Sequence, residues 1–384
     1  MENNGNDYYP IIANIAKLKT SVSKLYGFAY ATSLYRLNEL KNACMNYSSD
    51  FFDIRYIIDD KVEKEFKVLL KNNKLINLLP HVYIPVDYKN IKSSDKVELF
   101  VFYKSIIPIA GKIIYNPKNK CLILKSNKYW HNLIKFTIWD LEPPTKYLND
   151  FMYYMLLNHG YLTLHASAIV DDNGDATILM GKPNTGKSIS TYHLVRDKGY
   201  KLLGDDIIVI DTNKKMVYSC PYSFTYFHNK YLIKKFFEDG IIPQKEKIKI
   251  DFNEFMKNIP LIYLFISFGY KYEELFKKLP YTPIGNLKNM VILEKCEKNS
   301  VTKFNNEEKA IRLIKLLNDI EFHWWKSNAI KSLEYVYEEP IIPKIESLEQ
   351  SLISKVLKNI NVYKVESKNS LEFYKKIDEI VKSH

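Results

Sequence analysis

The chain has 384 residues, of which 46% are hydrophobic and 26% are charged, which is typical of a soluble protein with two or three domains and a substantial core. Its formal net charge is +12, but the basic residues are almost all lysines spread along the chain, so we expect no nucleic-acid partner. The longest apolar stretch, near residues 260–268, is too short to span a bilayer, so we expect no membrane partner.

The sequence contains four widely separated cysteines: Cys44, Cys121, Cys220 and Cys296. They form no C-x-x-C pair, so neither a zinc ribbon nor a disulfide framework is predicted. Reduced thiols are typical of proteins that stay inside the cell. The first residues are polar and include no signal-peptide core. We therefore expect a cytoplasmic protein.

Residues 1–142 have the pattern of an N-terminal mixed α/β domain with an antiparallel sheet. The spacing of apolar residues predicts helices over 32–41 and 62–70. Short apolar runs predict strands over 53–58, 81–85, 97–103, 112–115, 121–125 and 136–139. The polar turn at 116–120 predicts a hairpin between the two strands that flank it. No residue in this domain carries recognisable chemistry.

The pair Pro143-Pro144 marks the clearest boundary in the chain, because two consecutive prolines interrupt regular structure. We expect a second domain over 143–304 that starts with a helix over 147–157. Further along this domain, apolar runs predict strands over 261–266 and 290–294.

Residues 305–384 predict a mostly helical C-terminal region that packs on the second domain. Asn306 precedes an amphipathic helix and suits its N-cap. The pair Trp324-Trp325 is expected to serve packing. A final edge strand is predicted over 362–365, and a closing helix over 370–381.

A phosphate-binding motif lies in the second domain. A strand over 162–170 is followed by the turn Asn173-Gly174, a strong hairpin signal, so the next strand, 176–180, is expected to pair antiparallel with it. The loop Gly181–Ser188 reads G-x-x-x-x-G-K-S, which cradles the phosphates of nucleoside triphosphates. The helical pattern over 188–198 places this loop at a helix N-terminus, which favours an anion.

The residues expected to bind ATP, or another nucleoside triphosphate, are Gly181, Asn184, Thr185, Gly186, Lys187, Ser188 and Ile189. We expect Lys187 to reach the terminal phosphates and Ser188 to bind Mg²⁺. The pair Asp205-Asp206 opens an apolar strand over 207–210, and Asp206 is the expected second Mg²⁺ ligand. Adjacent residues on a straight strand face opposite ways, so both carboxylates share one site only at a strand end or an irregular turn.

Three segments together resemble the HPr kinase/phosphorylase family and the wider group of HPr-kinase-like enzymes, which share a core with phosphoenolpyruvate carboxykinase. They are Leu164-His165-Ala166-Ser167, Gly181–Ser188 and Gly204-Asp205-Asp206. The resemblance covers residues 160–220 and implies an α/β fold in which a mixed, antiparallel-rich sheet carries the P-loop.

The resemblance also implies roles for two side chains. Asp205 matches the family's general base on the acceptor hydroxyl, and His165 matches a histidine that orients the carboxylates, so Asp205, His165 and Lys187 are the candidate catalytic residues. Two structural alternatives stay open, namely a buried histidine satisfied by backbone groups and a solvated turn at the aspartates.

Two features depart from the family pattern. Pro183 removes one amide donor from the loop. No arginine lies between Arg196 and Arg312, so the family's catalytic C-terminal arginine has no counterpart, and the resemblance does not extend to phosphorolysis or to HPr as the acceptor. We therefore expect a specialised relative, such as a peptide-tailoring kinase.

The expected function is that of an ATP- and Mg²⁺-dependent kinase. It would transfer the γ-phosphoryl group to a hydroxyl, preferably of serine, on a peptide or protein that the N-terminal domain helps to recognise. Two alternatives stay open: a kinase of a small hydroxyl compound, and a nucleotide-binding regulatory protein without transfer activity. A homo-oligomer is also compatible with the sequence.

Overall fold

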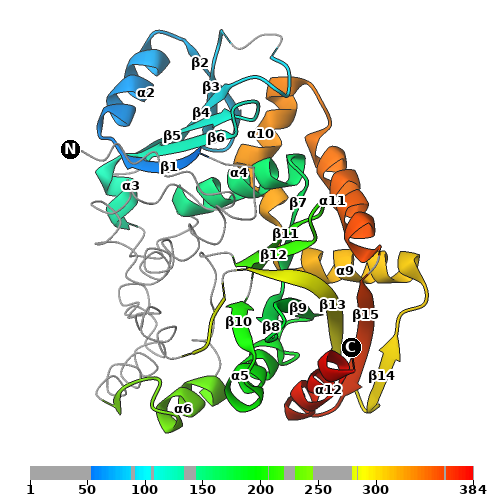
Figure 1. Cartoon of the computed structure of the whole chain (residues 1–384). Helices are drawn as coiled ribbons and strands as arrows, with labels where there is room; N and C mark the ends of the chain where they lie inside the picture. The colour runs from blue at the N-terminus through cyan, green and yellow to red at the C-terminus, as the bar shows by residue number, and fades with distance from the viewer. Residues whose placement is uncertain are drawn as a thin grey trace, which may run out of the picture.

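The structure is a computed structural model, and it describes residues 53–87, 91–104, 108–133, 144–205, 207–219, 230–244, 279–282, 284–358 and 360–383. These residues form two β-sheets with helices packed on them (Figure 1). The predicted α/β class with mixed sheets is therefore confirmed. The predicted boundary near residue 142, the helix over 32–41 and the strands over 136–139 and 261–266 lie outside the described residues.

The first sheet has six strands in the order β1-β6-β5-β4-β3-β2. They are β1 (Asp53–Ile58), β2 (Leu75–Leu79), β3 (Val82–Pro85), β4 (Val97–Tyr103), β5 (Ile109–Asn116) and β6 (Cys121–Ser126). Neighbours pair antiparallel except β1 and β6, which are parallel. The predicted strands from 53–58 to 121–125 and the hairpin between β5 and β6 are confirmed, whereas β2 is a strand that the sequence pattern did not predict.

Among the helices that contact this first sheet, two lie in the same part of the chain as its strands. The predicted helix over 62–70 is confirmed as α2 (Lys61–Lys71), which buries Val62 and Phe66. The ring of Phe66 stacks on Phe102 of β4, with ring centroids 4.3 Å apart. The short helix α3 (Lys128–Leu133) was not predicted, and it contacts β5.

The second sheet has nine strands. They are β7 (Tyr161–His165), β8 (Ser167–Val170), β9 (Asp175–Gly181), β10 (Lys201–Gly204), β11 (Ile207–Asp211), β12 (Met216–Ser219), β13 (Ile284–Lys295), β14 (Ser300–Lys303) and β15 (Asn361–Ser367). The predicted antiparallel pairing of β8 with β9 is confirmed, and β9, β13 and β15 run parallel. The strand predicted over 362–365 is present as β15, but its predicted position at the edge of the sheet is wrong, because β15 lies between β13 and β14. The outer strand β14 is short and exposed, so its sequence lacks the apolar pattern of a strand.

Two interrupted strands connect the two ends of this sheet, β10-β8 at one end of the strand order and β11-β7 at the other. The single strand expected over 162–170 is wrong, because it breaks at Ala166 into β7, which pairs with β11, and β8, which pairs with β9 and β10. The opposite strand breaks too, between β10 and β11. The pairs His165–Ile207 and Ala168–Gly204 are three residues apart on both strands, so the register continues across the break. Together the four strands form one two-stranded ribbon that bends at this point.

The C-terminal region is mostly helical, as predicted. Its elements are α9 (Glu307–Glu321), the 3-10 turn η4 (Trp324–Lys326), α10 (Asn328–Tyr337), α11 (Ile341–Leu357) and α12 (Ser370–Lys382). The predicted N-cap is confirmed, because the Asn306 side chain accepts a hydrogen bond from the Lys309 N–H at 2.9 Å. Helix α12 packs along α5 (Lys187–Lys198), near the bottom of Figure 1, and α6 (Lys230–Glu238) lies nearby.

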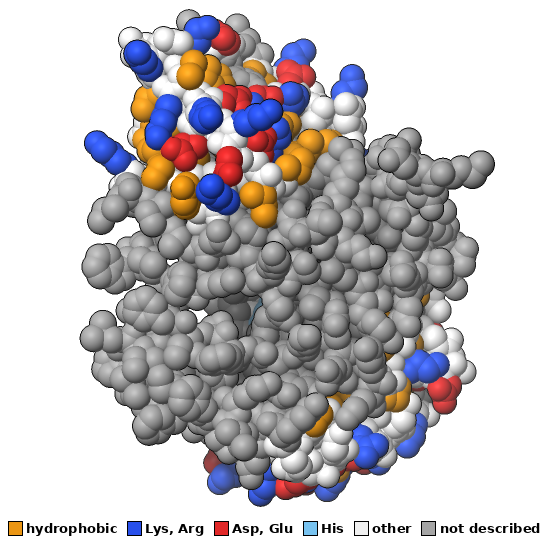
Figure 2. Space-filling view, turned by 90° about the vertical axis from the view of Figure 1, so that its left-hand side faces the viewer, with side chains coloured by type: hydrophobic (Ala, Val, Ile, Leu, Met, Phe, Trp, Pro, Cys, Tyr) orange, Lys and Arg blue, Asp and Glu red, His pale blue; other side chains and the backbone are white. Residues whose placement is uncertain are grey.

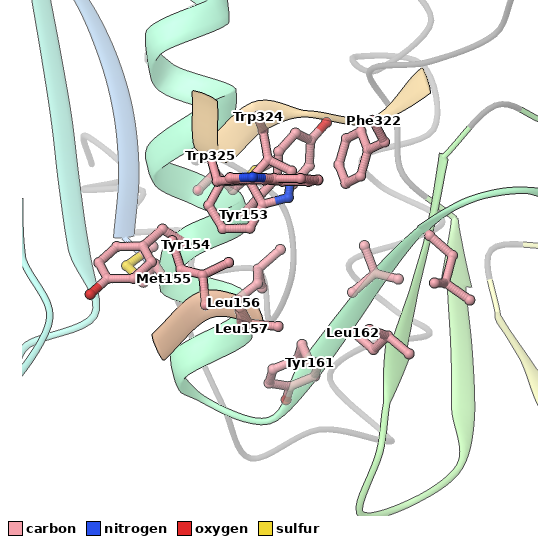
Figure 3. Close-up of a cluster of buried hydrophobic side chains, with 14 of the residues drawn as sticks. Tyr153, Tyr154, Met155, Leu156, Leu157, Tyr161, Leu162, Phe322, Trp324 and Trp325 are labelled. Atoms are coloured by element: carbon pink, nitrogen blue, oxygen red, sulfur yellow. The ribbon is translucent and has the colours of Figure 1, made fainter. Parts of the chain in front are cut away.

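Helix α4 (Pro144–Asn158) joins the two sheets, because it contacts β6 of the first and β7 of the second. The prolines were expected to interrupt structure, but Pro144 begins this helix, since its fixed φ and missing N–H suit a first turn. Figure 3 shows aromatic side chains of α4 close to those that follow α9, and the rings of Tyr153 and Phe322 pack edge to face with centroids 4.8 Å apart. The predicted packing role of Trp324 and Trp325 is confirmed, because both are buried in this core.

Charges of both signs mix on the described surface of the first sheet, at the top of Figure 2. Ion pairs such as Lys67–Glu63 at 2.6 Å and Lys112–Glu98 at 2.7 Å neutralise part of the lysine excess there. None of the helices within the described ranges has the length and apolar character that crossing a membrane requires.

Candidate functional site

The predicted phosphate loop connects the end of β9 to the start of α5. Asn184 and Gly186 have left-handed φ angles of 60° and 116°; asparagine tolerates the first, and the second favours glycine. The N–H and the hydroxyl of Thr185 both donate to the Lys182 carbonyl, at 3.2 and 2.5 Å. These bonds close a tight turn before the helix, so the first amides of α5, which lack partners inside the helix, face the loop.

Lys187, the first residue of α5, folds back across the loop. Its Nζ donates to the Gly181 carbonyl at 2.8 Å, and only 8% of the residue is exposed. The ammonium group therefore lies at the N-terminus of a helix, where the macrodipole already favours an anion. This position suits contact with the terminal phosphates of a nucleotide, and that role remains a prediction.

Ser188 brings the start of α5 into contact with the bend of the ribbon. Its hydroxyl lies 3.1 and 3.0 Å from the two carboxylate oxygens of Asp205. Asp205 is only 1% exposed, and a buried carboxylate needs hydrogen-bond partners or a cation to offset its lost hydration. Two residues predicted as parts of one site, 17 positions apart in the chain, therefore lie together.

This pair of oxygen groups fits a magnesium ion. Mg²⁺ prefers hard oxygen ligands and takes few of them from the protein, because it keeps several waters and binds substrate phosphates. Ser188 and Asp205 offer one hydroxyl and one carboxylate within 3.1 Å of each other. Asp206, the residue predicted as the second ligand, lies outside the described residues. Within the part of the chain that is described, no group of three or more His, Cys, Asp or Glu side chains is arranged to hold a metal.

His165 and Asp205 reach the same bend from opposite strands. His165 ends β7 and pairs with Ile207, which is two residues after Asp205. The continuous register places Asp205 opposite Ser167, which is fully buried. Adjacent carboxylates can share one site only at a strand end or an irregular turn. Asp205 lies at such a position, between β10 and β11 rather than inside a strand.

Sequence reasoning missed the residue that holds the backbone of His165. The Asn318 side chain, buried on α9, accepts a hydrogen bond from the His165 N–H at 2.7 Å and donates to the Thr163 carbonyl at 3.3 Å. The amide group thus binds β7 as a neighbouring strand would. Its amide nitrogen also donates to Glu349 Oε1 at 2.7 Å. The signal in the sequence is slight: a polar residue on the apolar face of an amphipathic helix.

A buried carboxylate lies behind Asn318. Burial raises the pKa of Glu349 on α11, and the nearby ammonium of Lys315, at 3.2 Å, only partly opposes that shift. Lys315 also pairs with Asp319 at 2.9 Å. Helices α9 and α11 therefore share a buried polar network that ends on the backbone of β7.

Comparisons with known proteins find little. No family model matches the chain, and no curated protein matches it. Among solved structures, the chain is similar to the HPr(Ser) kinase/phosphatase from Coxiella burnetii, with 13% sequence identity over 58% of this chain and 95% of that chain, at a TM-score of 0.26. A TM-score this low establishes no shared fold.

Proposed function

We propose that the chain is an ATP- and Mg²⁺-dependent phosphotransferase of the HPr-kinase type that phosphorylates a hydroxyl group of a peptide or protein. The observation that carries the proposal is the contact of Ser188 with Asp205 at the start of α5. A phosphate loop alone supports nucleotide binding. A buried carboxylate against the loop's hydroxyl adds the group that metal binding and phosphoryl transfer both need.

The fold around the loop also supports this type of core. The strand that leads into the loop, β9, pairs antiparallel with β8 and parallel with β13. Most P-loop proteins place only parallel strands beside this strand. The mixed arrangement agrees with the antiparallel-rich core that the three sequence segments imply.

The proposed reaction uses the residues in the following way. The loop amides and Lys187 hold the β- and γ-phosphates, and Mg²⁺ at Ser188 and Asp206 would neutralise charge on them. The acceptor oxygen forms a bond to the γ-phosphorus while the bond from that phosphorus to the β,γ-bridging oxygen breaks. The hydroxyl proton passes to Asp205, and ADP leaves.

Each of the three predicted regions of the chain would have its own role in the reaction. Residues 143–304 would form the catalytic core, 305–384 would pack on it, and 1–142 would help to recognise the acceptor. Two arrangements of the described residues support this. Helix α4 contacts both sheets, and Asn318 of the C-terminal region binds the backbone of β7.

The test is transfer from radiolabelled ATP to a pool of serine-containing peptides, with free serine in a parallel arm. Wild-type protein with Mg²⁺ should label the peptide pool, and Lys187→Ala should lose at least about a hundredfold of that rate, because a cation on the transferred group is lost. Labelling of free serine alone would favour the small-molecule kinase. Binding of Mg·ATP without transfer in either arm would favour a regulatory protein.

A further inference from the structure

The closing helix α12 touches the phosphate loop with its first residue. The hydroxyl of Ser370 donates a hydrogen bond to the carbonyl of Thr185 at 3.1 Å. These two residues are 185 positions apart in the chain. The contact therefore connects the end of the C-terminal region to the centre of the proposed nucleotide site.

The approach of α12 to the loop is close enough to require a glycine. A Cβ atom added to Gly186 would lie 2.7 Å from the Ser370 Cβ and 3.0 Å from its Oγ. Gly186 also has a φ of 116°, which L side chains rarely adopt. Ser370 thus packs directly against the loop at Gly186.

The hydrogen bond fixes the direction of one amide in the loop. In a trans peptide the C=O and the following N–H point in opposite directions, and none of the described residues has a cis peptide. Because the Thr185 carbonyl points to Ser370, the Gly186 N–H points away from α12. Backbone N–H groups at this place in a phosphate loop are the ones that bind phosphate oxygens.

Helix α12 is held firmly against α5, so Ser370 has a fixed position. The ring of Tyr374 stacks on His193 of α5 with centroids 4.9 Å apart. Near the other end of α12, Asp378 accepts a hydrogen bond from Tyr200 at 2.9 Å and pairs with Lys198 at 3.1 Å. The apolar side of α12, which includes the fully buried Phe373, packs into the same core as α5.

We infer that Ser370 is a positioning residue for the nucleotide: its hydroxyl holds the Thr185–Gly186 peptide in the orientation that presents the Gly186 N–H to the phosphates. The inference rests on the proposed nucleotide site. It gives the C-terminal helix a part in binding, because without the bond the peptide beside a glycine is free to rotate.

The test uses Ser370→Ala, with Ser383→Ala as the matched control. Ser383 follows α12, and among the described residues its hydroxyl donates to the Ile380 carbonyl, three positions earlier, at 2.8 Å. The affinity for a fluorescent ATP analogue with Mg²⁺ should fall about 3- to 10-fold in Ser370→Ala, the loss expected for one hydrogen bond. Ser383→Ala should bind the analogue as wild type does, and both variants should melt at the wild-type temperature.

An NMR measurement reports directly on the peptide group between Thr185 and Gly186. Thr185–Gly186 is the one Thr–Gly pair in the sequence, so protein with carbonyl-labelled threonine and amide-labelled glycine gives a single amide–carbonyl correlation. This signal should be single and sharp in wild type, and shifted and broadened in Ser370→Ala. Unchanged affinity in Ser370→Ala would overturn the inference. Failure of the wild-type protein to bind Mg·ATP would instead overturn the proposed function.

Discussion

The hydroxyl of Ser188 lies 3.0 and 3.1 Å from the carboxylate oxygens of the buried Asp205. The Ser188 hydroxyl lies in the first turn of α5, directly after the loop. The Asp205 carboxylate lies at the bend of the ribbon, between β10 and β11. The two therefore meet only when the loop and the ribbon are both formed. This relationship turns a phosphate-binding loop into a site that suits a metal–nucleotide complex.

Ser188→Ala should weaken the binding of Mg²⁺ at the nucleotide site. Loss of a metal-binding hydroxyl is expected to raise the Mg²⁺ concentration needed for half-maximal ATP binding by at least about tenfold. Ser190→Ala is the matched control, because Ser190 lies one half-turn further along α5, is fully buried, and its hydroxyl has no hydrogen-bond partner among the described residues. Equal Mg²⁺ requirements in the two variants would show that Ser188 is not a ligand.

Lys187→Ala should reduce ATP affinity by at least about tenfold, because the ammonium at the helix N-terminus contributes a charge-assisted contact to the phosphates. Lys182→Ala is its control. Lys182 lies in the same loop, but its side chain is exposed and only its carbonyl takes part in the turn. Calorimetric titration with Mg·ATP measures both. A similar loss in the two variants would indicate a general charge effect instead of a specific contact.

Asn318→Ala should destabilise the protein by about 2–4 kcal/mol, because it leaves buried backbone groups of β7 without their partner and removes one hydrogen bond from the Glu349 carboxylate. Urea unfolding measures this change. Asn119→Ala, at an exposed turn, should change the free energy of unfolding by less than about 0.5 kcal/mol. If Asn318→Ala is as stable as the control, Asn318 does not hold the strand that carries His165.

The buried carboxylate of Glu349 should make stability depend on pH. Burial raises its pKa above the ordinary value of 4.5, so the folded protein binds a proton more tightly than the unfolded chain. The free energy of unfolding should therefore fall as the pH rises from 4.5 through the raised pKa. Glu349→Gln keeps an oxygen that can accept the Asn318 hydrogen bond, and it should remove this part of the dependence. Identical pH profiles for the two proteins would contradict the assignment.

The local parts of the site could be predicted from the sequence because short segments encode them. The loop needs glycines and a lysine at fixed spacing, and the hairpin before it needs Asn173-Gly174. The cap at Asn306 follows from a single residue with a strong conformational preference.

The remaining parts depend on contacts between distant segments. Nothing in the apolar run around Ala166 marks the bend, because the break arises from pairing with two different strands. Asn318 is 153 residues from His165, and Ser370 is 185 residues from Thr185. Contacts between residues this far apart leave no periodic pattern in the sequence. Only the folded structure therefore identifies Asn318 and Ser370. The place of Asp206 and the roles of Asp205 and His165 remain predictions.

The most direct test of the proposed function compares wild type with Asp205→Asn in two assays on the same preparation. One assay measures the affinity for Mg·ATP, and the other measures transfer of the γ-phosphoryl group to serine-containing peptides. At saturating Mg²⁺, Asp205→Asn should keep ATP affinity within about threefold, since the loop, Lys187 and Ser188 remain and asparagine keeps an oxygen beside Ser188. It should lose transfer by about a hundredfold or more. Full transfer activity in Asp205→Asn would contradict the account.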